Sequence, residues 1–154
     1  EERVSHAPSE PPLDFYKASP HALKALIAFE VAIGKLGLEP KLLDLVKLRA
    51  SQINGCAYCI DLHTADLRKA GETDRRLATL SVWHETPFFT GRERAALSWT
   101  EAVTQVSLTH VPDEAYEALA AQFSEAERVD LTMAINAINS WNRLSIGFRK
   151  QLST

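Results

Sequence analysis

The sequence is poor in cysteine, in long apolar runs and in positive charge. Its 154 residues include only two cysteines, which cannot build the disulfide framework of a small secreted domain. No stretch approaches about 18 consecutive apolar residues, so no membrane span is predicted. The 17 Lys and Arg are outnumbered by 20 Asp and Glu. Nucleic-acid binding is therefore disfavoured, because proteins of that class are usually basic.

The N-terminal region also lacks the apolar core of a secretion signal. Residues 1–12 are polar and carry three prolines, which is unlike a signal peptide. We therefore expect a cytoplasmic location, where a close cysteine pair is typical of redox or metal chemistry. Because four prolines interrupt residues 1–20, this segment is predicted to be an extended N-terminal arm. Leu13, Phe15 and Tyr16 are expected to pin the arm to the body or to a neighbouring molecule.

Residues 21–154 are predicted to form one all-α domain, long enough to bury a core. Apolar stripes and helix start and stop signals predict about seven helices, near residues 21–35, 40–53, 56–70, 74–82, 90–107, 113–122 and 125–149. Thr90 with Glu93, and Ser124 with Glu127, have the spacing of capping boxes. No β alternation is present. Phe88 and Phe89 lie in a loop and are expected to be exposed.

The reactive residues gather between Asp44 and His63. Asn54 is expected to cap a helix that begins near Cys56. Cys56, Cys59 and His63 then occupy positions i, i+3 and i+7, which share one helix face. The two cysteines are close enough in this arrangement for a disulfide. His63 follows Cys59 by one turn, within hydrogen-bonding reach.

Three effects predict an activated thiol in this segment. The helix dipole favours a thiolate at Cys56, in the first turn. His63 can accept the thiol proton from Cys59, and Asp44 on the preceding helix is a candidate to orient that histidine. We therefore assign the attack to Cys59, and resolution of the sulfenic acid to Cys56. Tyr58 either packs between the cysteines or lends its hydroxyl to a proton path.

Two other interpretations of the cysteine pair remain open. In the first, the cysteines are inert core residues. In the second, the pair is part of a zinc site formed by Cys56, Cys59, His63 and either Asp44 or Asp66. The sequence has no second Cys/His pair to complete a typical structural zinc site. The corresponding alternative function is a non-enzymatic, oligomeric redox-sensing or metal-binding protein. No haem, flavin or metal motif is present, so we expect the cysteine pair to be the only redox centre.

The block from Leu43 to Gly71, LDLVKLRASQINGCAYCIDLHTADLRKAG, resembles the alkylhydroperoxidase D-like branch of the carboxymuconolactone decarboxylase superfamily. The likeness extends over about residues 13–150 through Ser81–Phe89, Glu93–Glu101 and Ile138–Arg143. It implies an all-α homo-oligomer, often a trimer or hexamer. It also implies that the cysteine pair reduces hydroperoxides and is regenerated by an external dithiol, such as a lipoyl-bearing protein. The decarboxylase branch lacks the pair, so lactone decarboxylation is disfavoured.

The resemblance also implies a role for each site residue. Cys59 falls on the peroxidatic cysteine, Cys56 on the resolving one and His63 on the family histidine. Asp44 stands where the family has a glutamate, and Tyr58 stands where the original enzyme has a histidine. Together with the spacing argument, this predicts a thiol-dependent peroxidase or disulfide oxidoreductase in antioxidant defence. Its expected partners are a hydroperoxide, a thiol reductant protein and further copies of the chain.

Overall fold

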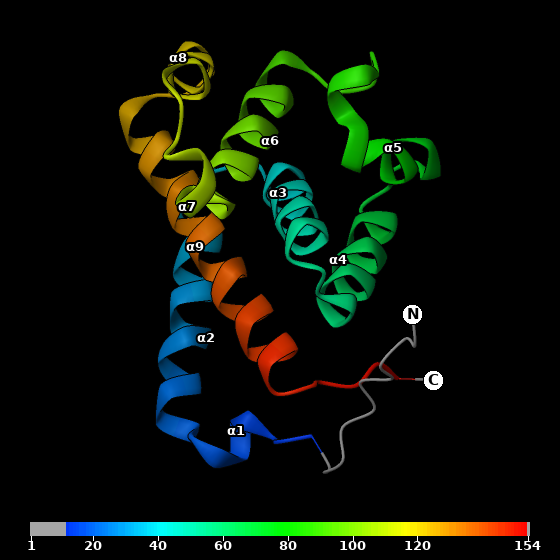
Figure 1. The fold of residues 1–154 in the computed structure, drawn as a ribbon, viewed down its shortest axis with the longest axis vertical. Helices are drawn as coiled ribbons and strands as arrows, with labels where there is room; N and C mark the ends of the chain where they lie inside the picture. Colours follow the sequence, from blue (N-terminus) through cyan, green and yellow to red (C-terminus); the bar gives the residue numbers. More distant parts are fainter. Residues whose placement is uncertain (1–11, 154) are drawn as a thin grey trace.

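The computed structural model describes residues 12–153, which form helices and no strands. This confirms the predicted all-α class. Figure 1 shows the helices in sequence order: α1 (Phe15–Ala18), α2 (Pro20–Gly34), α3 (Pro40–Asn54), α4 (Ala57–Lys69), α5 (Asp74–Thr79), the 3-10 helix η1 (Leu80–Glu85), α6 (Gly91–Thr104), α7 (Val106–Thr109), α8 (Asp113–Gln122) and α9 (Glu125–Gly147). The seven predicted helices are all present. The structure adds the single turns α1 and α7, and it replaces the end of the fourth predicted helix, near residues 74–82, by η1.

Helix α3 is the centre of the fold, packed against α4, α6 and α9 (Figure 1). Its residues Leu42, Leu43 and Val46 enter a core cluster shared with α6, α8 and α9. Leu45 and Leu48 enter a second cluster with α4, α5, η1 and α6. Because α3 contributes to both clusters, its burial fixes the position of the turn that follows it.

The part of the predicted arm that the structure describes is helical rather than extended. Residues 1–11 of the arm lie outside the described residues. Asp14 accepts backbone hydrogen bonds at the start of α1, and Pro20 occupies the first position of α2, where its fixed φ suits a helix. The Phe15 side chain is buried, with its ring centroid 6.2 Å from that of Phe148. Tyr16 stacks on Trp141 at 6.3 Å.

The loop before α6 is more buried than we expected from the sequence. Phe89 is only 5% exposed and belongs to the second core cluster, and Phe88 packs partly against it. The guanidinium group of Arg75 lies over the Phe88 ring, 4.2 Å from its centroid. That of Arg76 lies over the Phe89 ring at 4.6 Å. Arg76 also donates to the Phe88 carbonyl, at 2.5 Å. The expected exposure was therefore wrong, because charged side chains from α5 cover both rings.

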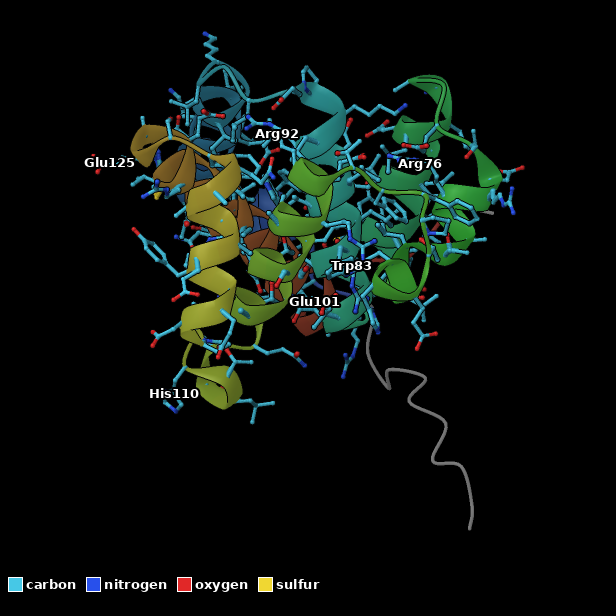
Figure 2. The ribbon with its side chains drawn as sticks, turned by 90° about the horizontal axis from the view of Figure 1, so that it is seen from above. Arg76, Trp83, Arg92, Glu101, His110 and Glu125 are labelled. Carbon is cyan, nitrogen blue, oxygen red and sulfur yellow. A yellow bond between two sulfur atoms is a disulfide. The ribbon has the colours of Figure 1, made fainter. Side chains whose placement is uncertain are left out.

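Side-chain hydrogen bonds tie η1 to the neighbouring helices. Trp83 Nε1 donates to Glu101 Oε1 at 2.5 Å, and Arg49 Nε donates to the same oxygen at 3.2 Å. Figure 2 shows Trp83 of η1 beside Glu101 of α6. These contacts join η1, α6 and α3 at one carboxylate.

None of the helices within residues 12–153 has the length and apolar character needed to cross a membrane.

Candidate functional site

The turn between α3 and α4 places the cysteine pair. Asn54 is the last residue of α3, and Gly55 turns the chain with a φ of 71°. Cys56 itself is the N-cap of α4, and its Sγ accepts the Cys59 N–H at 3.3 Å. The prediction that Asn54 caps this helix was therefore wrong. Its side chain is used in a contact with another helix.

That contact is an amide network between the turn and α9. Asn54 Nδ2 donates to the side-chain oxygens of Asn139 at 3.0 Å and Asn142 at 2.9 Å. Asn142 Nδ2 donates in turn to Ser51 Oγ at 3.0 Å. Asn139, Asn142 and Ser51 are buried, so each bond satisfies a polar group that water does not reach. The network fixes the start of α4 relative to α9.

Cys56 and Cys59 are joined by a disulfide, with their Cα atoms 5.3 Å apart. The spacing had predicted that such a bond is possible. The residues are 1% and 3% exposed, respectively. In this oxidised form, no group of three or more His, Cys, Asp or Glu side chains among the described residues is arranged to hold a metal ion.

Cys59 lies on the wall of a cavity of about 210 Å³. Parts of the chain far apart in sequence meet there, and the wall is mainly aromatic and apolar, with polar groups from α2, α4, α9 and the C-terminal segment. The lining residues are Phe15, Tyr16, Glu30, Tyr58, Cys59, Leu62, His63, Trp141, Ser145 and Lys150. Figure 1 shows the N-terminal end of α4 and the C-terminal end of α9 near the same end of the molecule.

His63 is a mostly buried base on this wall. Burial, reinforced by the nearby positive charge of Lys47, lowers its pKa from 6.5 to about 4. The imidazole is therefore neutral near pH 7. Its Nδ1 atom is 4.0 Å from Asp66 Oδ2, which is too long for a hydrogen bond.

Of the predicted site residues, Tyr58, Cys59 and His63 share the cavity, but Asp44 does not line it. Asp44 is half-buried on α3, and burial raises the pKa of its carboxyl. No hydrogen bond joins Asp44 to His63 in the part of the chain that the structure describes. Its role in orienting the histidine thus stays a prediction. Cys56 lines another pocket, together with Arg149 and Lys150.

Sequence reasoning missed several cavity residues. Glu30 reaches the wall from α2, and its Oε1 atom is 2.6 Å from Lys47 Nζ. Lys150 lies over the Tyr58 ring, 4.7 Å from the centroid, and also faces Phe15 and Tyr16. Burial and the neighbouring Tyr58 raise the pKa of the Tyr16 hydroxyl. The sequence did contain one signal for Glu30. It is the only charged residue between positions 25 and 34, and a lone charge in an apolar helix is a candidate functional residue.

Comparison with known proteins identifies the family of this chain. Residues 18–102 match the carboxymuconolactone decarboxylase family. The chain belongs to this family. It is 40% identical to the uncharacterised protein YdfG of Bacillus subtilis over 134 residues, which cover 87% of this chain and 91% of YdfG. The family resemblance predicted from the Leu43–Gly71 block is thereby confirmed.

A solved structure shares the complete fold of this family member. It is a protein of unknown function from Agrobacterium tumefaciens, suggested to be an antioxidant defence protein AhpD. The two chains are 46% identical with a TM-score of 0.91, covering 94% of this chain and 99% of the other. A shorter match, 44% identical over 45 residues, is to the alkyl hydroperoxide reductase AhpD of Hyphomonas neptunium and covers 29% of this chain and 25% of that protein.

Proposed function

We propose that this protein is a thiol-dependent hydroperoxidase or disulfide oxidoreductase that acts through Cys56 and Cys59. The observation that carries the proposal is the disulfide between these residues, with Cys59 on the wall of a cavity that also contains His63. A cysteine pair that closes within one helical turn can cycle between dithiol and disulfide without moving the rest of the fold. The 44% identity to an alkyl hydroperoxide reductase AhpD, although limited to 45 residues, supports the same chemistry.

The proposed cycle begins with the reduced pair. His63 accepts the proton of the Cys59 thiol, and the thiolate attacks the terminal oxygen of the hydroperoxide. An S–O bond forms, the O–O bond breaks, and the leaving alkoxide takes the proton from the imidazolium. Cys56 then attacks the sulfenic acid, which forms the disulfide and releases water. The peroxide is reduced by two electrons, and the two thiols supply them.

An external dithiol must restore the thiols by exchange, because the cycle otherwise ends at the disulfide. A lipoyl-bearing protein has the required chemistry. Asp44 and Tyr58 are proposed to assist the proton path, Asp44 through His63 and Tyr58 through its hydroxyl on the cavity wall. Since the cysteines carry the electrons, this proposal invokes no further cofactor.

We also propose that copies of the chain assemble through α2. This helix is apolar around most of its circumference, and such helices are usually buried. Ile27, Val31 and Leu36, in and just after α2, are nevertheless 45%, 52% and 46% exposed. A second copy seated on this face would cover them, which agrees with the homo-oligomer expected from the sequence.

The first experiment measures free thiols and intact mass of the reduced protein before and after one equivalent of cumene hydroperoxide. We expect loss of both thiols, a mass decrease of two hydrogens and full reversal by dihydrolipoamide. Cys59→Ser should abolish turnover. Cys56→Ser should leave one thiol that peroxide converts to a sulfenic acid. Turnover retained in Cys59→Ser would overturn the assignment, and oxidation without turnover would favour the redox-sensor alternative.

A further inference from the structure

Two buried polar atoms on the cavity wall have no hydrogen-bond partner within residues 12–153. They are Glu30 Oε2 and His63 Nδ1. Buried polar atoms in native proteins are nearly always satisfied, so two exceptions that line one cavity call for an explanation. Cys59 lines the same cavity. The unsatisfied acceptor and the unsatisfied imidazole nitrogen are therefore placed where the proposed reaction moves a proton.

Glu30 is held in place by only one of its two oxygens. Its Oε1 atom is 2.6 Å from Lys47 Nζ, and both side chains are largely shielded from water, with exposures of 29% for Glu30 and 15% for Lys47. Screening by solvent is weak at such a site, so the ion pair fixes the carboxylate on the wall. The second oxygen, Oε2, is buried and has no hydrogen-bond partner among the described residues.

The other carboxylates near His63 are less well placed for this role. Asp66 lies one turn along α4, but its side chain is 44% exposed, and it is not part of the cavity wall. Asp44 is also absent from the wall. Glu30 is thus the one carboxylate among the described residues that lines the cavity together with Cys59 and His63.

We propose that Glu30, fixed by Lys47, is the carboxylate on the cavity wall that works with His63 to hold the proton during peroxide reduction. This inference rests on the proposed function. The proton leaves Cys59 for the imidazole, and the anionic Oε2 stabilises the imidazolium. When the O–O bond breaks, the imidazolium gives the proton to the leaving alkoxide and becomes neutral again. Glu30 is therefore a positioning residue, which acts through His63.

The charges around the imidazole give the expected direction of change. Lys47 lowers the pKa of His63, whereas Asp66 and Glu30 raise it. Removing only the Glu30 charge leaves Asp66 alone to oppose Lys47, which disfavours the imidazolium further. The remaining titratable groups that face this region come from α1, α3, α4 and the segment after α9, and they are Tyr16, Asp44, Tyr58 and Lys150.

The test compares Glu30→Gln with the double variant Glu30→Gln/Lys47→Met, which replaces the ion pair by neutral side chains of similar size. We measure the second-order rate of thiol oxidation by cumene hydroperoxide from pH 5 to 9, and the His63 pKa by NMR. Glu30→Gln should slow the reaction at pH 7 by about 100-fold, a typical contribution from acid–base catalysis. It should also lower the His63 pKa.

The double variant separates the effect of the two charges on the His63 pKa from the need for the Glu30 carboxylate in the reaction. We expect its His63 pKa to return toward the wild-type value, while its rate stays as low as that of Glu30→Gln. Glu117→Gln, on the exposed face of α8, is the matched control and should react like wild type. An unchanged rate in Glu30→Gln, or a wild-type rate in the double variant, would overturn the inference. If wild type itself fails to react with the hydroperoxide, the proposed function is refuted. An unshifted His63 pKa in Glu30→Gln would then refute the electrostatic coupling between Glu30 and His63 independently of the reaction.

Discussion

The buried imidazole of His63 should make the stability of the protein depend on pH. The His63 pKa is about 4 in the folded chain and 6.5 in an unperturbed histidine, and burial is the main cause of the difference. Between these values the unfolded chain binds a proton that the folded chain does not. Lowering the pH through this window therefore favours unfolding, and the loss is complete only below about pH 4.

The size of the effect follows from the two pKa values. Each unit of difference is worth about 1.4 kcal/mol, so the full contribution is about 3 kcal/mol. At pH 5 the unfolded histidine is almost fully protonated and the folded one almost neutral. The loss relative to pH 8 is then about 2 kcal/mol. With an m-value of about 2 kcal/mol per molar urea, the unfolding midpoint falls by about 1 M.

Urea unfolding of oxidised wild type and His63→Gln at pH 8 and pH 5 tests this reasoning. Glutamine does not titrate, so subtracting the two proteins removes the contribution of every other group. We expect the wild-type midpoint to fall by about 1 M more than the midpoint of the variant. Equal shifts in the two proteins would show that His63 is solvated in the folded state, and the argument from burial would be refuted.

Two further substitutions test the turn that carries the cysteines. Asn142→Ala removes a buried donor to Ser51 and an acceptor for Asn54, and should cost about 2–3 kcal/mol in urea unfolding, whereas Asn136→Ala on the exposed face of α9 should cost less than about 0.5 kcal/mol. Equal costs would exclude the amide network as a stabilising element. Gly55→Ala forces a side chain into the left-handed region, where nothing contacts the added carbon, so it should cost about 1–2 kcal/mol from backbone strain alone. Gly55→Asn should be milder, and a cost for Asn equal to that for Ala would contradict this cause.

The helices were predictable because their signals are local. Thr90 and Ser124 form the capping boxes that the spacing of Glu93 and Glu127 predicts. Apolar periodicity depends only on residues within a few turns, so it places a helix without knowledge of its partners. The short turns α1 and α7 were missed because four residues are too few to show such a period.

Two of the wrong predictions share one cause. Asn54 was assigned to a cap, and Phe88 and Phe89 to an exposed loop, from their immediate neighbours in sequence. In the structure Asn54 bonds to α9, 85 and 88 residues away. The two aromatic rings are covered by arginines from α5. Local patterns cannot report contacts that form only when distant helices pack.

The candidate site shows the same contrast between local sequence patterns and contacts made by distant helices. The sequence by itself determined that Cys56, Cys59 and His63 share a short helical segment, because their spacing sets their relative positions once that helix forms. Only the tertiary structure decided which other groups surround them. Glu30, Trp141 and Lys150 come from segments far from the cysteines. The packing of α9 against both α2 and α4 brings them to one cavity. Burial in that cavity, rather than the identity of the residue, then makes His63 a neutral base.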